Sequence, residues 1–273
     1  MFREKLENNL RKYIRDREFM SVTGVGHRAE LEFLAQGENN INYIIKDGAE
    51  KHLLRLNLKA EAAAESIEKE FSVLETLALT GVTPRPFYLD LSREKVDYPL
   101  LMTEYIEGKA LDYQDDLKEA AQTLAKIHKI EPENKDLKRE TKPLTALWEQ
   151  ATKNLEGYFA SNLALPEVKE FLEKIKTELA EKREKEEELM ELLPLAIVNN
   201  EVNSEDFIVK NEFKLAYLVD WEQALITTPL QDLSRFMLPT NTLWKTNFIF
   251  NQGEEEEFLH HYLKERGIDS KYY

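Results

Sequence analysis

Four carboxylates in the second half of this chain lie at or beside the ends of short apolar runs. They are Glu201, Asp206, Asp220 and Glu222, and all of them fall within residues 195–235. Acidic side chains that gather where strands end can hold Mg²⁺, because this ion takes oxygen ligands and usually keeps water and substrate phosphate in the rest of its shell. Phosphoryl transfer is therefore the first hypothesis for the chemistry.

The same stretch predicts the elements that must position these carboxylates. One apolar run ends at residue 198, and two more, residues 207–209 and 215–219, are separated by the polar turn residues 210–212. Apolar runs bounded by polar turn residues are typical of hairpin strands. The stretch predicts a short strand, a polar loop that carries the first two carboxylates, a β-hairpin, and then Asp220 at the start of a further loop.

This stretch resembles the catalytic core of the aminoglycoside phosphotransferase/choline kinase superfamily, whose members phosphorylate small molecules. The family pattern is close to HGDLHPGN, two apolar residues, a hairpin, DWE and then P-x-x-DL. Here residues 199–208 read NNEVNSEDFI, residues 220–222 read DWE, and residues 229–233 read PLQDL. The second half of the pattern matches well, whereas Asn-Asn-Glu replaces the His-Gly-Asp motif. The chain is thus identified as a divergent member.

The first half of the chain fits the same family in the same order. Residues 37–45 read as a polar turn that feeds a strand, and residues 52–56 follow as a second strand after an Asp-Gly hairpin turn. On that strand, Arg55 stands where kinases place the basic residue that binds the α- and β-phosphates. Residues 61–79 have helical spacing, and Glu70 is placed like the glutamate that orients this basic residue.

The resemblance also implies the hinge and the roles of the reacting groups. Residues 99–106 resemble the hinge between two lobes, where the backbone around Thr103, Glu104 and Tyr105 would bind the adenine of ATP. Asp206 and Asp220 would hold Mg²⁺.

The catalytic base is where the chain departs from the family. Glu201 stands in place of the catalytic aspartate and would accept the proton of the acceptor hydroxyl. Its extra methylene shifts the carboxylate by about 1 Å, which can cost on the order of 10²-fold in rate when geometry is tight. One interpretation is an active enzyme whose loop is rebuilt around Glu201, with Asn199 and Asn203 in place of the two family histidines. The alternative is a pseudokinase that binds nucleotide or acts as a scaffold.

The acceptor pocket is expected in residues 238–250, which contain Trp244. Apolar walls with a few hydrogen-bonding groups are the usual composition of such a pocket, and Trp244 could stack on a cationic amine. An aromatic-rich part of the core is the competing interpretation. Glu222 is either a weak contact of this site or a surface acid. Asp232 is expected to organise a loop or cap a helix, and His128 to pack in the core.

The composition of the chain limits the classes of partner and the compartment that we expect. The net charge of −15 argues against a nucleic-acid partner, which would favour a basic face, and weakly favours a cationic acceptor such as an amino alcohol. Protein and RNA kinases are disfavoured, the former because residues 220–232 lack a recognisable activation segment. No apolar run approaches the roughly 18 residues of a membrane span, and the N-terminus lacks the apolar segment of a signal peptide, so a cytoplasmic protein is expected. With no cysteine, disulfides and thiolate chemistry are excluded. The oligomeric state is not specified by any pattern.

The predicted architecture is an α+β, two-lobe, protein-kinase-like fold. Residues 1–98 form a nucleotide-binding lobe of antiparallel sheet and one packed helix. Residues 99–106 are the hinge, and residues 107–273 form a mostly helical lobe for catalysis and acceptor binding. Within this lobe, residues 167–191 alternate Lys and Glu and predict one long solvated helix. The proposed reaction is ATP- and Mg²⁺-dependent phosphorylation of a hydroxyl on a small polar molecule: an amino alcohol, an aminoglycoside or a sugar.

Overall fold

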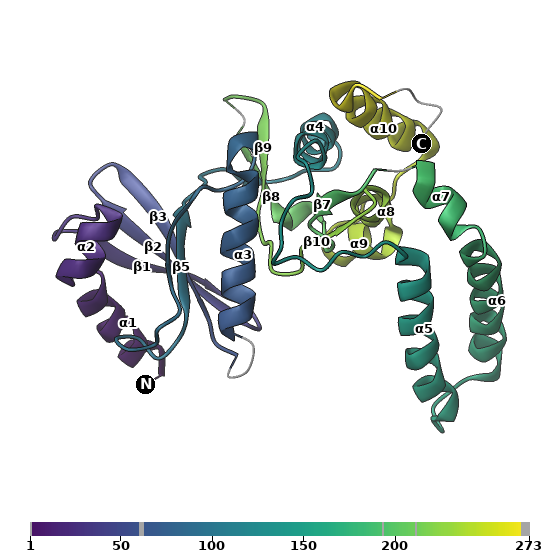
Figure 1. The fold of residues 1–273 in the computed structure, drawn as a ribbon, viewed down its shortest axis with the longest axis horizontal. Helices are drawn as coiled ribbons and strands as arrows, with labels where there is room; N and C mark the ends of the chain where they lie inside the picture. Colours follow the sequence, from purple (N-terminus) through teal and green to yellow (C-terminus); the bar gives the residue numbers. More distant parts are fainter. Residues whose placement is uncertain (1, 60–62, 193, 211, 269–273) are drawn as a thin grey trace.

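A computed structural model describes residues 2–59, 63–192, 194–210 and 212–268, and it places a five-stranded sheet beside a mostly helical body (Figure 1). The sheet is antiparallel throughout, in the order β1-β2-β3-β5-β4. Its strands are β1 (Glu30–Gln36), β2 (Asn40–Asp47), β3 (Glu50–Asn57), β4 (Pro86–Asp90) and β5 (Leu100–Glu104). The predicted α+β architecture is confirmed. The turn between β2 and β3 is the expected Asp-Gly turn, with Gly48 at φ 64°, a conformation that glycine adopts without strain.

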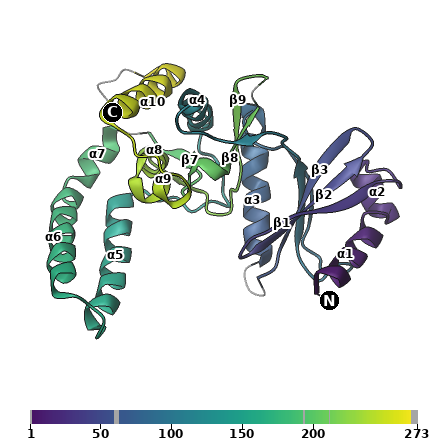
Figure 2. The same cartoon turned by 180° about the vertical axis from the view of Figure 1, so that it is seen from behind.

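Helices cover both faces of this sheet (Figures 1 and 2). Helices α1 (Phe2–Tyr13) and α2 (Arg17–Thr23) lie on one face and α3 (Ala63–Leu77) on the other. On α1, Leu6, Leu10 and Tyr13 are buried, whereas Phe2 is half exposed. The predicted helix over residues 61–79 corresponds to α3, although residues 61 and 62 lie outside the described part of the chain.

Helix α3 packs on β3, β4 and β5, but its second half belongs to the core of the helical body. Val73, Leu74 and Leu77 are buried in the same cluster as the apolar residues of that body. The sheet has a separate cluster, formed with α1 and α2. The second half of α3 therefore packs in the core of the helical body, and no described residue of α3 belongs to the cluster of the sheet with α1 and α2.

The helical body contains five short strands and seven helices in its described part. Strands β6 (Lys109–Ala110), β8 (Phe207–Lys210) and β9 (Leu215–Leu218) form one small sheet, and β7 (Ala196–Val198) pairs with β10 (Leu225–Thr227). The helices are α4 (Leu117–His128), α5 (Pro143–Ala160), α6 (Pro166–Arg183), α7 (Glu186–Leu192), α8 (Leu230–Met237), α9 (Pro239–Lys245) and α10 (Gln252–Arg266). The predicted hairpin is confirmed as β8–β9, and α4 packs along α10.

The connection from β5 into the helical body depends on a glycine. A Cβ atom at Gly108 would lie 2.6 Å from the carbonyl oxygen of Val209 and 2.7 Å from the Cγ2 atom of Ile208. Only glycine lets the chain approach β8 this closely, so that β6 can pair with it.

A second connection ties α3 to the helical body, and we call residues 131–140 the strap. The Nδ2 group of Asn134 in the strap donates hydrogen bonds to Thr76 Oγ1 (2.9 Å) and to the Ser72 carbonyl (3.2 Å) on α3. At its other end the strap pairs with β10, where Ile226 N donates to the carbonyl of Lys138 (2.9 Å). Since β10 pairs with β7, the strap joins α3 to the strand that precedes the polar loop.

The predicted single helix over residues 167–191 is wrong in detail. It is divided into α6 and α7, and Glu186 at the break is buried. Its carboxylate accepts hydrogen bonds from the backbone N–H groups of Leu144 and Thr145, which are otherwise unpaired at the start of α5. Helices α5 and α6 form a hairpin that projects from the body (Figure 1). No helix in the described ranges is long and apolar enough to cross a membrane.

Candidate active site

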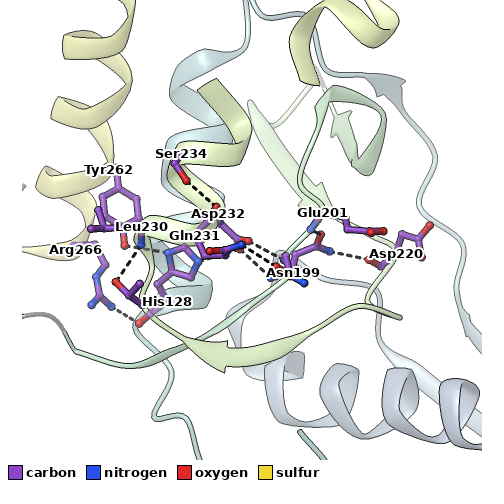
Figure 3. A network of polar contacts seen from close by, with 12 residues as sticks. His128, Asn199, Glu201, Asp220, Leu230, Gln231, Asp232, Ser234, Tyr262 and Arg266 are labelled. Carbon is purple, nitrogen blue, oxygen red and sulfur yellow. Dashed lines mark hydrogen bonds and ion pairs between the residues drawn. The ribbon is translucent and has the colours of Figure 1, made fainter. Parts of the chain in front are cut away.

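The polar loop after β7 is held in place by a buried carboxylate. Asp232, in the first turn of α8, is fully buried and accepts hydrogen bonds from the backbone N–H groups of Asn199 (2.9 Å) and Asn200 (2.8 Å). Its other neighbour is His128 of α4, whose Nε2 atom lies 3.3 Å from Oδ2 (Figure 3). The expectations of a loop-organising Asp232 and a packed His128 are both confirmed.

The side chain of Asn199 then joins this loop to the segment after β9. Its Nδ2 group donates to the backbone carbonyl of Asp220 at 2.7 Å (Figure 3). Both segments contain a residue in the left-handed region, Asn200 at φ 73° and Asp220 at φ 63°. Asn and Asp tolerate this conformation better than other non-glycine residues. Asn200 stands where the motif that this stretch resembles has its glycine, the residue type that adopts this conformation without strain.

Four of the predicted site residues come together in one cavity of about 540 Å³. Glu201, Asp206 and Asp220 line it from the polar loop and from the segment after β9, and Trp244 lines it from α9. The other described residues in its wall are neutral polar groups and an arginine: Asn199, Asn203, Arg235, Thr240 and Asn241. The cavity can therefore hold a polar molecule next to several carboxylates.

A buried ion pair connects the cavity to the sheet. Arg55 on β3 and Glu70 on α3 are both buried, and Arg55 Nη1 lies 2.8 Å from Glu70 Oε1 and 3.2 Å from Asp220 Oδ1. Asn42 also accepts a hydrogen bond from Arg55 Nε (3.2 Å). Burial raises the pKa of Glu70 to about 7, although the charge of Arg55 opposes this. The predicted pairing of Arg55 with Glu70 is thus present in the structure, and it also reaches Asp220.

Asp206 lacks such a cationic partner among the described residues. Burial, followed by repulsion from Asp220, raises its pKa to about 8, and its carboxylate accepts hydrogen bonds only from Asn203 (2.9 Å from the backbone N). Two carboxylates in one cavity, one of them without a counter-charge, fit a hard divalent cation. No group of three His, Asp or Glu side chains in the described ranges could form a metal cage, so phosphate and water oxygens would complete the shell.

Glu201 follows Asn199, whose Oδ1 atom accepts a hydrogen bond from the backbone N–H of Glu201 at 3.2 Å. Burial raises the pKa of its carboxyl above the ordinary range, while the charge of Arg235 opposes this shift. A raised pKa brings a carboxylate closer to the value that favours proton transfer near neutral pH. Glu201 is exposed in the cavity wall, where an acceptor can reach its side chain.

Two predicted groups lie outside the wall of this cavity. Glu222 accepts a hydrogen bond from Asn40 Nδ2 at 3.1 Å, which links the start of β2 to the segment after β9. Thr103 and Glu104 end strand β5, and Tyr105 follows it. The backbone N–H of Glu104 donates to the carbonyl of Arg85 at 2.8 Å. Adenine binding at this hinge stays a prediction.

The expected acceptor segment, residues 238–250, serves two purposes. Helix α9 contributes Trp244, which is 78% exposed, to the cavity. Phe248 and Phe250 instead pack against Tyr113 in an aromatic cluster. Arg235 was not predicted as a site residue. Arg235 lies three residues after Asp232, on the first helix after the DWE segment. This spacing is the feature of the sequence that could have indicated a place near the site.

Comparisons with known proteins identify the family and the fold. A family model described as "Phosphotransferase enzyme family" matches residues 30–270, and no curated protein matches the sequence. An aminoglycoside phosphotransferase from Alicyclobacillus acidocaldarius is structurally similar, with a TM-score of 0.62 and 15% identity over 93% of this chain and 79% of that one.

Two further solved structures show the same fold. Choline kinase LicA from Streptococcus pneumoniae has a TM-score of 0.59 and 19% identity over 93% of this chain and 80% of its own. An ethanolamine kinase from Plasmodium vivax has a TM-score of 0.60 and 16% identity over 95% and 74%. At these identities the similarity establishes the fold, and the family model covers most of the sequence. The chain belongs to the phosphotransferase enzyme family.

Proposed function

We propose that this protein transfers the γ-phosphoryl group of ATP to a hydroxyl of a small polar molecule in a Mg²⁺-dependent reaction. The observation that carries this proposal is the convergence of Glu201, Asp206 and Asp220 in one cavity, with Asp220 paired to Arg55. Related structures carry nucleotide: a spectinomycin phosphotransferase was solved with ADP and spectinomycin. ATP and Mg²⁺ are accordingly the expected cosubstrate and metal.

Each residue has a role that follows from its chemistry. Asp206 and Asp220 would hold Mg²⁺, which neutralises phosphate charge when bound. Arg55, oriented by Glu70, would contact the phosphates, and the hinge around Thr103, Glu104 and Tyr105 would bind adenine. Residues 1–98 would then be the nucleotide-binding lobe, residues 99–106 the hinge, and residues 107–273 the lobe for catalysis and acceptor binding.

The reaction balances with Glu201 as the base. A lone pair of the acceptor oxygen forms the new bond to the γ-phosphorus atom, and the bond from that atom to the bridging oxygen of ADP breaks, with its electron pair leaving on ADP. The proton of the acceptor hydroxyl passes to the Glu201 carboxylate. Much of the acceleration in phosphoryl transfer comes from positioning and electrostatic stabilisation, so a glutamate base is compatible with turnover.

A non-catalytic nucleotide-binding protein is the second candidate. The observation that favours it is Glu201 itself, because it replaces the aspartate of the motif that this stretch resembles. Both candidates require nucleotide binding, but only the first requires ADP production.

A thermal-shift titration with ATP, with and without Mg²⁺, tests the proposal together with an ADP-release assay. We expect Mg²⁺-dependent stabilisation by ATP and slow ADP release, and we expect Asp220→Ala to lose both. Mg²⁺-independent stabilisation with no ADP release favours the non-catalytic protein. No stabilisation by ATP under either condition refutes nucleotide binding and, with it, the proposed phosphotransfer.

A further inference from the structure

One charged residue in the cavity wall has no role in the proposed reaction. The three acids in the wall are assigned to proton acceptance and metal binding, whereas Arg235 is the sole cationic side chain among the described residues that line the cavity. It belongs to α8, one turn after the buried Asp232 that holds the polar loop. The position of Arg235 relative to the catalytic loop is therefore fixed by a rigid element.

The guanidinium of Arg235 has no hydrogen bond or ion pair within the described ranges, and its charge acts on Glu201 only through space. The nearby Lys245, at the end of α9, shows the contrast, because its ammonium group lies 2.8 Å from Glu205 Oε2. An unpaired arginine in a polar cavity has donors available for a ligand.

The backbone around Arg235 is braced while its side chain is left free. Asn241 of α9 donates a hydrogen bond from Nδ2 to the carbonyl of Arg235 at 2.8 Å, which joins the end of α8 to the helix that carries Trp244. The planar guanidinium fork binds carboxylate and phosphate oxygens in a bidentate manner. Beside it, the exposed indole of Trp244 supplies an apolar wall.

The proposed reaction already uses all three acids in the described wall, so none of them is available to bind a cationic acceptor. Once Mg²⁺ offsets Asp206 and Asp220, the remaining charges in the described wall are Glu201 and Arg235. An ammonium group would then be placed near a guanidinium of like charge, whereas an oxyanion would be placed near its complement. With Mg²⁺ counted, the charges in the described wall balance, so the negative charge of the whole chain, which weakly favoured a cationic acceptor, does not carry over to this cavity.

We infer that the acceptor carries an oxyanion, a carboxylate or a phosphate monoester, which Arg235 binds while the acceptor hydroxyl faces Glu201. This inference rests on the proposed phosphotransferase function and specifies its substrate class. The acceptor is thus a hydroxy acid or a phosphorylated polyol or sugar, and its negative charge selects it over amines of the same size.

Two matched series of acceptors test this inference by ADP release from Mg²⁺ and ATP with the full chain. The three-carbon series is glycerol, 3-amino-1,2-propanediol, glycerate and glycerol 3-phosphate. The sugar series is glucose, glucosamine, glucuronate and glucose 6-phosphate. We expect an anionic member to have a kcat/KM roughly tenfold or more above the neutral and cationic members of its series, and the preferred anion distinguishes a carboxylate from a phosphate ligand.

Variants then assign the preference to Arg235. Arg235→Gln is expected to raise KM for the anionic acceptor about 10- to 100-fold and to change kcat/KM for the neutral member less than about threefold. Arg235→Lys should raise KM for the anionic acceptor less than Arg235→Gln does, because lysine keeps the positive charge but lacks the bidentate guanidinium group. Lys245→Gln removes a nearby cation that is already paired and should alter KM less than about threefold. KM for ATP should stay constant in all three variants.

Several results would overturn the inference. They are a neutral or cationic member ranking first, a preference that survives Arg235→Gln, or Lys245→Gln acting as strongly as Arg235→Gln. ATP binding that depends on Mg²⁺, without transfer to any member of either series, also counts against this acceptor class. Absence of any Mg²⁺-dependent ATP binding by the unaltered protein is a different outcome, because it refutes the proposed function itself.

Discussion

Replacing Arg55 with methionine is expected to lower the free energy of unfolding by about 3–5 kcal/mol at pH 8, because the buried carboxylate of Glu70 loses its partner. For a chain of this size, the loss corresponds to a fall in Tm of roughly 6–20 °C. Replacing both partners, as Arg55→Met with Glu70→Gln, leaves no buried ion of this pair. The double variant is therefore expected within about 1–2 kcal/mol of the unaltered protein.

The pH dependence gives a second readout of the same pair. Burial raises the pKa of Glu70 to about 7, against an unfolded value of 4.5. A carboxyl whose pKa is raised on folding adds stability below its unfolded pKa, and this contribution is lost as the pH rises through the folded pKa. Without Arg55, the pKa of Glu70 rises further. The loss in free energy of unfolding caused by Arg55→Met should therefore be smaller at pH 6 than at pH 8. In the double variant with Glu70→Gln, this pH dependence should disappear.

Urea denaturation of the metal-free protein at pH 6 and pH 8 measures these free energies. Arg85→Met is the control, because Arg85 is 65% exposed in its side chain and pairs with Glu104 at 3.4 Å; its cost should stay below about 1 kcal/mol. If Arg55→Met costs as little as this control, or if the double variant is no more stable than Arg55→Met, the pair is not desolvated and the reasoning is refuted.

Three further predictions concern separate parts of the structure. Glu201→Gln should lower kcat for ADP release about 10²- to 10⁴-fold with KM for ATP unchanged; an unchanged kcat would exclude it as the base. Gly108→Ala should lower the free energy of unfolding in urea by more than about 2 kcal/mol, because the added Cβ meets the backbone of β8. Gly157→Ala in α5 is the control: its Cβ meets nothing within 4 Å, and it should raise the free energy of unfolding by about 0.5–1 kcal/mol. Asn134→Ala, which removes the hydrogen bonds between the strap and α3, should lower both ADP release and stability, the latter by about 1–3 kcal/mol; a change in stability alone would separate the strap from the active site.

The sequence was informative where local patterns and spacing decide the structure. The β8–β9 hairpin follows from two apolar runs around a polar turn, and the segment after it places Asp220 next to the loop that carries Asp206. For the hairpin, a local signal was sufficient. The Arg55–Glu70 pair was instead predicted from the family resemblance, which places a basic residue on a strand and an orienting glutamate on the helix that follows.

Long-range contacts were beyond what the sequence could predict. The Lys- and Glu-rich run has a continuous helical pattern, yet it breaks at Glu186, because that side chain turns inward to bind the start of α5, 41 residues away along the chain. The role of Arg235 depends on which charges surround it, and this is decided by the packing of α8 and α9. Neither contact has a counterpart in local propensity or periodicity.

The strap also limits how the sheet can separate from the helical body. Asn134 joins the strap to α3 by several hydrogen bonds, whereas the sheet contacts the segment after β9 through Asn40 with Glu222 and through Arg55 with Asp220. We expect a movement that widens the cavity to break these two contacts and to leave the hydrogen bonds of Asn134 in place, so that α3 stays fixed to the helical body.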